Sequence, residues 1–555
     1  MKNRMQFQEK QDPLMGAGFI ALILCLAFRI PLMRAIGAEG LAYFAPANEV
    51  FLLCIAFCNH GFSEALSNMM RYRIKREQYR NANRIFRAAY AITITFGLFV
   101  VAFVLIFNSF ISNVVFLQHF SQMALYMIAP AIALMAFTCL LRGYFQGMGS
   151  PYPSAHSMIV EQVFTIIFGL VFALYFVSYG EKVAGILRNE HFSMSYGAMG
   201  AAIGIAASSV ISFLHLFVIY IMYRGTTKRQ IYRDNTRQIE TSSFIYQSLL
   251  LSAIPIGAFA VLFQLNHLID QRMFYYYFNK LNENGEVILN KAFVWGNYYG
   301  IYLVIVGILT AMICMIFMKN SRAISAAWFR EEYRVSREKL MQSLTAAIII
   351  AIPVAVLTAV LAEPIASLLD VEAVDTATKL LQNGSILIVF YTFSYFWFDL
   401  LKQFKKTAQV LMLAGGGLAI HIFALLIIMP LIKHAEQLII GIIVTNIIGV
   451  GFSFMLGFFL VKRMLNYQGE WMNRSARTLM ITMLCSAIIG LMVLALSKGI
   501  LNLVGPAVTI LICLLISLVA YLILMILLRG LTISELDHLP GGQFMIRLGR
   551  LIRFF

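Results

Sequence analysis

Charged side chains stand inside several long apolar stretches of the chain, and their chemistry is more specific than that of any other residues. Arg29 lies in the first such stretch, 14–36, two residues before Pro31. An arginine at membrane depth costs roughly 2.5 kcal/mol or more unless it faces water or a partner. The proline removes a backbone donor and favours a bend beside the charge. We therefore predict that Arg29 lines a cavity; the alternative is a side chain that reaches the membrane interface.

Acidic residues in later apolar stretches have two interpretations. Glu49 and Glu161 lie within apolar stretches, and Asp270 lies near the end of another. One of them could pair with Arg29 or take up a proton or a sodium ion. Alternatively, each could be a buried partner that holds helices in register, or be protonated outright. The sequence leaves both interpretations open.

The full set of candidate cavity residues adds two arginines and a glutamine. The ends of apolar stretches favour an interfacial position for arginine. An arginine that does face a cavity can bind phosphate oxygens with its planar fork, and amide side chains can hydrogen-bond sugars. The predicted binding residues are Arg29, Arg34, Glu49, Glu161, Gln162, Asp270 and Arg272.

Membrane-spanning helices must position these residues. The chain is 60% hydrophobic and 12% charged, with a mean hydropathy of +0.80, far from the balance of soluble proteins. About fourteen stretches meet the 20-residue criterion for a spanning helix. Basic residues gather in alternate loops, which accounts for the net charge of +17 without nucleic acid. We therefore predict an all-α polytopic membrane protein. The side on which the basic loops gather is predicted to be the cytoplasm, which also places both termini there.

The spans fall into blocks that suggest a duplication. Residues 1–241 would hold helices one to six and residues 242–465 helices seven to twelve, and each block opens on a helix that contains proline and a charge. Two six-helix lobes related by an axis along the membrane normal would surround a central cavity. Two extra helices, within 466–530, stand outside this repeat.

The last segment, 531–555, is predicted to be an amphipathic tail. Arg547, Arg550 and Arg553 recur every third residue between apolar ones, so on a helix they form a stripe opposite a broad apolar face. We predict a helix that lies on the cytoplasmic leaflet with its arginines near anionic headgroups. The alternative is a disordered basic tail, because so short a helix is marginal by itself.

Several motifs resemble one family of transporters. FRIPL at 28–32, followed by GAEG at 37–40, resembles the first-helix signature of the polysaccharide-transporter and lipid II flippase branch of the multidrug/oligosaccharidyl-lipid/polysaccharide exporter superfamily. Within that branch, the chain is most similar to stage V sporulation protein B-like proteins. RGYFQG at 142–147, with Glu161 and Gln162, resembles the turn between the fourth and fifth helices of that family.

The resemblance implies a function as well as a fold. It implies fourteen helices in two lobes that move undecaprenyl-diphosphate-linked sugars to the outer leaflet of the bacterial cytoplasmic membrane by alternating access. We expect a lipid-linked saccharide and membrane lipids as partners, no nucleic acid, a monomer and no cofactor. Coupling to a sodium ion, a proton or the membrane potential stays open. The glycan could belong to peptidoglycan, spore cortex or capsule.

Two other functions remain as alternatives. A multidrug cation exporter of the same superfamily would favour an acidic cavity, against which Arg29 argues. A membrane-embedded polysaccharide polymerase or ligase would need a sizeable outer loop with catalytic residues, whereas the longest outward loops, 179–195 and 279–291, are short. No stretch resembles a phosphate-binding P-loop. We therefore predict that the protein is not an enzyme.

Overall fold

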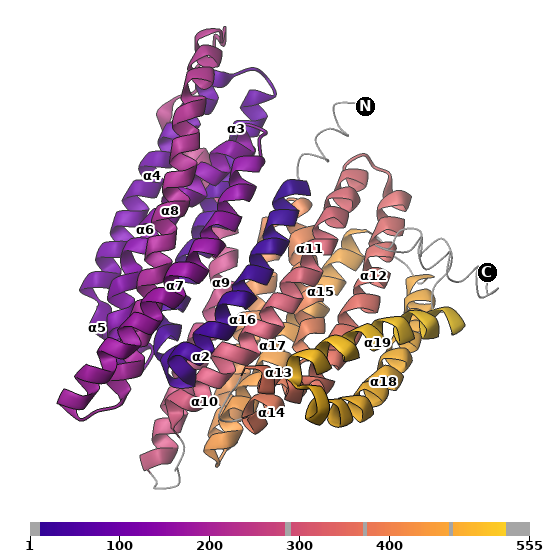
Figure 1. The fold of residues 1–555 in the computed structure, drawn as a ribbon. Helices are drawn as coiled ribbons and strands as arrows, with labels where there is room; N and C mark the ends of the chain where they lie inside the picture. The colour runs from indigo at the N-terminus through magenta and orange to yellow at the C-terminus, as the bar shows by residue number, and fades with distance from the viewer. Residues whose placement is uncertain (1–11, 284–289, 370–373, 466–469, 529–555) are drawn as a thin grey trace. The chain divides into compact units, whose positions relative to one another are not determined.

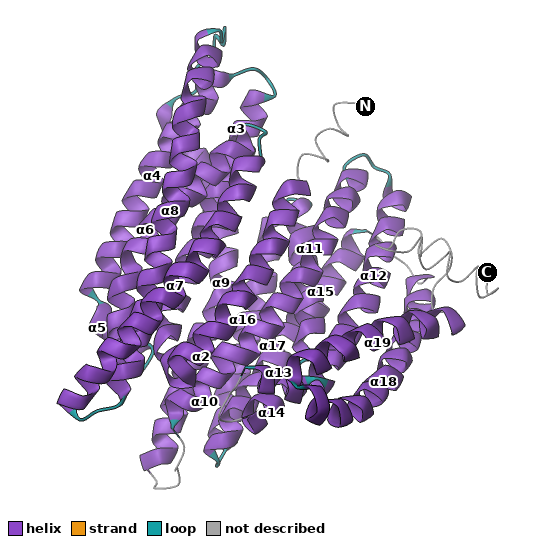
Figure 2. Ribbon diagram, viewed as in Figure 1, coloured by secondary structure: helices purple, strands orange, loops and turns teal. Residues whose placement is uncertain are grey.

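The computed structural model describes residues 12–283, 290–369, 374–465 and 470–528, whose regular structure is helical throughout (Figures 1 and 2). Twelve of these helices are long and apolar enough to cross a membrane, or thirteen with the bent pair Val374–Gly384 and Leu387–Gln403 as one span. The prediction of an all-α polytopic membrane protein is confirmed. This count does not confirm the predicted number of about fourteen spans. The predicted tail, 531–555, lies outside the described residues.

The first long helix, α2 (Asp12–Ala56), folds back on itself at Gly37. Gly37 has φ 64° and ψ 179°, which interrupts the helical backbone, and glycine adopts this conformation without a Cβ clash. The guanidinium of Arg29 lies 5.5 Å from the ring centroid of Phe44, although fifteen residues of straight helix would separate the two positions by about 22 Å. The sequence predicts a bend at Pro31, but the break in helical geometry is at Gly37.

By its internal packing the chain divides into two compact units, Met1–Gly300 and Ile301–Phe555. In the first unit the two halves of α2 pack with helices from the rest of the unit. After α2 these elements are η1 (Phe57–Ser63), α3 (Glu64–Ile74), α4 (Tyr79–Ile106), α5 (Asn108–Phe110), η2 (Ile111–Val115), η3 (His119–Ser121), α6 (Gln122–Gly147), α7 (Tyr152–Leu187), α8 (His191–Tyr232), α9 (Ser242–Glu283) and α10 (Lys291–Asn297).

Small residues set the spacing of α7 and α8 in the first unit. A Cβ added at Gly204 would lie 2.3 Å from the Cα of Gly169, and one added at Gly200 would lie 2.3 Å from the carbonyl oxygen of Phe172. Such close backbone approach gives membrane helices the van der Waals contact that lipid tails cannot supply. The close packing of α7 and α8 therefore holds the polar residues on these two helices in fixed positions.

The second unit follows η4 (Tyr298–Tyr302), and its last two long helices pack on α12. Tyr521 donates a hydrogen bond of 2.9 Å to the carbonyl oxygen of Ile349, and both residues lie in one buried cluster with Cys485 and Val493. The predicted lobe boundaries at 241 and 465, and the cavity between lobes, stay predictions. The elements of this unit are α11 (Leu303–Trp328), α12 (Tyr333–Val360), α13 (Ala362–Leu368), α14 (Val374–Gly384), α15 (Leu387–Gln403), α16 (Thr407–Ile428), η5 (Met429–Leu431), α17 (Ala435–Met464), α18 (Glu470–Val504) and α19 (Pro506–Leu527).

Candidate functional site

Arg29 lies between two aromatic rings in the first unit. Its guanidinium carbon is 5.5 Å from the ring centroid of Phe44 and 5.6 Å from that of Tyr299, which is within the range of cation–π attraction. The hydroxyl of Tyr299 accepts a hydrogen bond of 2.6 Å from Nδ2 of Asn48. The Nη1 atom of Arg29 is buried and has no hydrogen-bond partner among the described residues. The Nη1 atom of Arg29 can therefore donate a charge-assisted hydrogen bond to an acceptor on a bound ligand.

Glu49 belongs to the same cluster, on the second half of α2. Glu49 is 3% exposed, and its Oε2 atom accepts a hydrogen bond of 2.7 Å from Nε2 of Gln264 on α9. Arg29 and His267 lie near enough for their charges to act on this carboxyl group. The fold-back at Gly37 is what allows Arg29 and Glu49 to meet, because both come from α2. We call the group Arg29, Phe44, Asn48, Glu49, Gln264, His267 and Tyr299 the Arg29 cluster.

Arg29 and Glu49 lie well inside a helix that is long and apolar enough to cross a membrane. At 1.5 Å per residue, Arg29 lies about 12 Å before Gly37 along one half of α2, and Glu49 lies about 18 Å after it along the other. The hydrocarbon core of a bilayer is about 30 Å thick. A charge at this depth needs water, a partner or a ligand.

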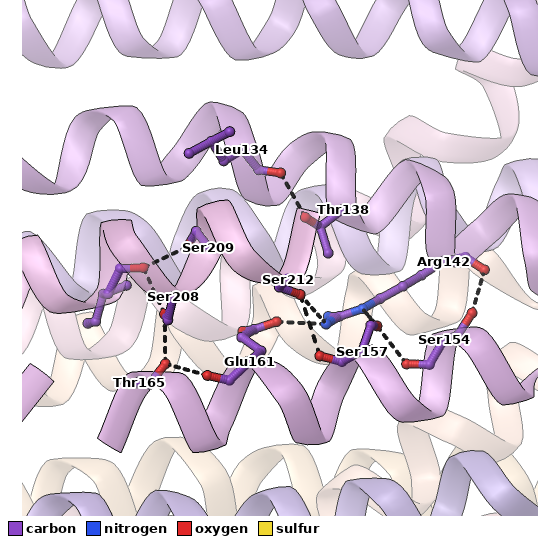
Figure 3. A network of polar contacts seen from close by, with 11 residues as sticks. Leu134, Thr138, Arg142, Ser154, Ser157, Glu161, Thr165, Ser208, Ser209 and Ser212 are labelled. Atoms are coloured by element: carbon purple, nitrogen blue, oxygen red, sulfur yellow. Dashed lines mark hydrogen bonds and ion pairs between the residues drawn. The ribbon is translucent and has the colours of Figure 1, made fainter. Parts of the chain in front are cut away.

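Glu161 has a different partner from the one proposed for it. Nη2 of Arg142, on α6, lies 2.6 Å from Oε2 of Glu161, on α7, and the Nε of Arg142 donates a hydrogen bond of 2.8 Å to Ser157. Nη2 also donates a hydrogen bond of 3.4 Å to Ser212 on α8 (Figure 3). The hydroxyl of Thr165 extends the network by donating hydrogen bonds of 2.8 Å to the backbone carbonyl oxygen of Glu161 and to a serine hydroxyl on α8. The pair thus holds three helices together within one network.

Arg142 is the charged residue that sequence reasoning left out of the site. It stands in the motif RGYFQG and within the predicted span 122–145, of which it is the one charged residue. Its burial, with 8% of the residue exposed, follows from the ion pair with Glu161 and the serine hydroxyls around it. A lone charge inside an otherwise uncharged span is the sequence signal that identifies Arg142.

The remaining predicted site residues differ in their exposure. Arg272 is exposed and donates hydrogen bonds to the carbonyl oxygens of Val114 and Val115, the latter at 3.4 Å. Arg34 is exposed, Gln162 is half-buried and Asp270 is fully buried. In the described part of the chain, no three His, Cys, Asp or Glu side chains are placed to hold a metal ion. Of the seven predicted residues, the structure therefore brings Arg29 and Glu49 into one cluster.

A second polar cluster lies where α10 meets the turn of α2. His191 Nδ1 is 3.0 Å from the hydroxyl of Tyr43 and 3.4 Å from Oε2 of Glu39, and the amide of Asn290 donates a hydrogen bond to Glu39. The chains approach very closely here. A Cβ added at Gly296 would lie 1.8 Å from the carbonyl oxygen of Ala38. This contact fixes α10, and so the neighbouring Tyr299, against α2.

Solved structures share this arrangement of helices. The lipid II flippase MurJ in an inward closed conformation superposes with a TM-score of 0.63 at 16% identity, and the match covers 92% of this chain and 98% of that chain. A multidrug resistance MATE family transporter of the MOP superfamily, in an outward-facing conformation, gives a TM-score of 0.59 at 16% identity over 83% of this chain and 97% of that chain. The fold is that of the MOP superfamily of transporters.

Curated relatives of this chain include two proteins of Bacillus subtilis (strain 168). Stage V sporulation protein B is 26% identical over 242 residues, which are 44% of this chain and 44% of that relative, so the match spans less than half of it. Lipid II flippase MurJ is 23% identical over 507 residues, 86% of this chain and 85% of that protein. No family model matches the chain. The resemblance to this branch of the superfamily is confirmed.

Proposed function

We propose that the protein moves an undecaprenyl-diphosphate-linked saccharide from the inner to the outer leaflet of the bacterial cytoplasmic membrane by alternating access. The observation that carries this proposal is the buried, unpartnered Nη1 of Arg29 within a helix long and apolar enough to cross a membrane. A diphosphate headgroup supplies the anionic acceptor that such a donor needs. The similarity to lipid II flippase MurJ of Bacillus subtilis supports the same class of cargo.

The surroundings of Arg29 suit a phosphate ester that carries a sugar. Phe44 and Tyr299 flank the guanidinium, and flanking rings hold its planar fork in one orientation for bidentate binding. Hydrogen bonds to charged groups contribute about 1.5–3 kcal/mol each. Asn266, on α9, is buried with its Oδ1 unpaired in the described part of the chain. Such an amide can hydrogen-bond sugar hydroxyls or water.

The other parts of the proposal concern topology and chemistry. Both termini lie in the cytoplasm, because the basic loops would then face the side that the positive-inside rule requires. The protein acts as a monomer with membrane lipids around it, needs no cofactor and leaves the cargo chemically unchanged. A sodium ion, a proton or the membrane potential supplies the coupling.

A flipping assay tests this proposal. Proteoliposomes would receive undecaprenyl-diphosphate-linked disaccharide with a fluorescent label, and a membrane-impermeant quencher would report the outer-leaflet fraction over time. We expect Arg29→Ala to abolish the protein-dependent rate, because the cargo loses its charged donor. The matched control is Arg334→Ala on α12, whose side chain is 93% exposed and which should flip at the wild-type rate.

The same liposomes separate the alternatives. Accumulation of a lipophilic fluorescent cation without lipid flipping would favour a multidrug exporter and contradict the proposal. A change in the mass of the recovered lipid would favour a polymerase or ligase. Wild-type flipping by Arg29→Ala, at equal protein content, would remove Arg29 from the binding site and leave interfacial placement as its role.

A further inference from the structure

We propose that Glu49 takes up one proton whenever a diphosphate binds to Arg29, so that cargo and proton bind to the protein together. This inference rests on the proposed function and concerns the same site. It identifies Glu49 as the proton acceptor and the anionic headgroup as the group that drives the uptake.

The neighbours of Glu49 favour its charged form against the cost of its burial. Its residue is 3% exposed, and the groups that face it are Arg29 from the first half of α2, His267 from α9 and Tyr299 from η4. Gln264 donates one hydrogen bond of 2.7 Å to it. A carboxylate removed from water is costly unless positive charge compensates it. His267, the hydrogen bond from Gln264 and Arg29 all favour the charged carboxylate, and Arg29 is the one permanent cation among these groups.

A bound diphosphate would compete with Glu49 for Arg29. The phosphate oxygens would take the free guanidinium donor and bring at least one further negative charge into a medium of low dielectric constant. Like charges at short range favour protonation of the weaker acid, and a carboxylate is protonated more readily than a phosphodiester-like oxygen. In the uptake step a proton from water bonds to a carboxylate oxygen of Glu49. On cargo release the O–H bond breaks and the proton returns to water.

This exchange keeps the net charge of the cluster small. Arg29 and Glu49 balance each other when the site is empty. Without proton uptake, the loaded site would carry the full negative charge of the diphosphate, whereas one proton on Glu49 removes one of these charges. The charge that must cross the hydrocarbon core is lower by the same amount, and so is its cost.

His267 is the competing proton acceptor. Its Nδ1 atom is buried without a hydrogen-bond partner among the described residues, and an imidazole nitrogen can accept a proton. The two groups can be separated by neutral, nearly isosteric variants, Glu49→Gln and His267→Gln, because each removes one titrating group and retains hydrogen-bonding capacity.

Calorimetry of the full-length protein in nanodiscs tests the inference. An undecaprenyl-diphosphate-linked disaccharide, whose diphosphate is esterified at both ends, would be titrated into wild-type protein in two buffers of equal pH and different ionisation enthalpy, since the difference in heat counts the protons taken up. We expect about one proton per diphosphate bound, and an affinity that falls about tenfold for each unit rise in pH over the range of uptake. Glu49→Gln should bind more tightly, with no uptake and no such slope. The matched control, Glu363→Gln on an exposed side chain of α13, should retain the wild-type proton count.

Each outcome is decisive. Binding by the wild-type protein with no proton uptake would overturn this inference and leave the proposed function intact. Uptake that persists in Glu49→Gln and disappears in His267→Gln would overturn the assignment to Glu49. An absence of diphosphate binding by the wild-type protein would overturn the proposed function and this inference together. The wild-type measurement needs no variant, so misfolding of a variant cannot mask the result.

Discussion

The Nη2 atom of Arg142 lies 2.6 Å from Oε2 of Glu161, and the two side chains are 10% and 15% exposed. Ser157 and Ser212 take up further donors of the same guanidinium, and Ser154 donates a hydrogen bond of 3.0 Å to the carbonyl oxygen of Arg142. Because these residues come from α6, α7 and α8, the ion pair and its hydrogen bonds connect three helices.

The first prediction concerns the ion pair between Arg142 and Glu161. Arg142→Leu should lower the free energy of unfolding by about 3–5 kcal/mol, because it leaves the Glu161 charge buried without its partner. The double variant Arg142→Leu/Glu161→Leu should recover most of that loss, since no uncompensated charge remains. Thermal unfolding of the purified proteins in one detergent measures both. A double variant no more stable than the single one would contradict a mainly structural role.

The second prediction concerns the shape of the cation at position 29. Arg29→Lys should flip cargo roughly tenfold more slowly than wild type, a loss of about 1.4 kcal/mol. Lysine keeps the charge and loses both the planar fork and the stacking on Phe44 and Tyr299. Initial flipping rates in liposomes with matched protein content provide the measurement. A rate equal to that of wild type would show that charge alone suffices.

The third prediction concerns the contact between α10 and the turn of α2. Gly296→Ala would place a Cβ 1.8 Å from the carbonyl oxygen of Ala38, so the backbones must separate, at a cost of about 1–3 kcal/mol. The control is Gly307→Ala on α11, where an added Cβ meets nothing within 4 Å. We expect only Gly296→Ala to lower the unfolding temperature and to increase trypsin cleavage near Lys291. Equal behaviour of the two variants would argue against tight packing at Ala38.

The fourth prediction is a pH dependence of stability at the link between α8 and α9. Partial burial opposes the charge of Asp234. Hydrogen bonds of 2.7 Å from the backbone N–H groups of Arg80 and Thr236 outweigh it and hold the pKa of Asp234 below its usual value. A pKa lower in the folded than in the unfolded state contributes stability above the unfolded pKa, and this contribution is lost as the pH falls through the folded pKa.

Unfolding midpoints measured from pH 6 down to pH 3 test this dependence. The wild-type protein should lose stability over the acid end of that range. Asp234→Asn should be less stable than wild type at pH 6, and the difference between them should shrink as the pH falls. A difference that stays constant with pH would show that the charge of Asp234 does not contribute.

The fifth prediction concerns the tail that lies outside the described residues. Deletion of the residues after Gly542 should reduce protein abundance more than flipping per molecule, because the predicted surface helix would anchor the chain to the leaflet without contacting cargo. Spin labels at Leu548 and Leu551 in liposomes should show restricted motion and low water accessibility. Freely mobile, water-exposed labels would favour the disordered alternative.

Hydropathy predicted the class of fold because each spanning helix must be apolar over its own length, which is a local property. Helix partners are not local. Glu161 and Arg142 meet because α6 and α7 are held side by side with α8, and no spacing in the sequence reports that arrangement. The cost of burying Arg29 did identify a residue with an unpartnered donor. The sequence allows three acidic partners for Arg29, and only the fold distinguishes Glu49 from Glu161.

The break in α2 shows the limit of residue-type rules. Pro31 is the stronger helix breaker by its chemistry, yet the helical angles persist there and end at Gly37. A proline can be accommodated in a membrane helix when neighbours satisfy the freed carbonyl. A glycine with positive φ reverses the chain, because no side chain opposes that conformation.

The fold-back at Gly37 also bears on how the chain enters the membrane during synthesis. Arg29 and Glu49 belong to the two arms of one helical hairpin, so both emerge from the ribosome before any later helix exists. If the arms enter together, the insertion penalty of each charged residue, roughly 2.5–3.5 kcal/mol at the bilayer centre, is reduced by the other. We expect a nascent chain truncated after Ala56 to integrate both arms, whereas Glu49→Leu in the same chain should leave the first arm inserted less often.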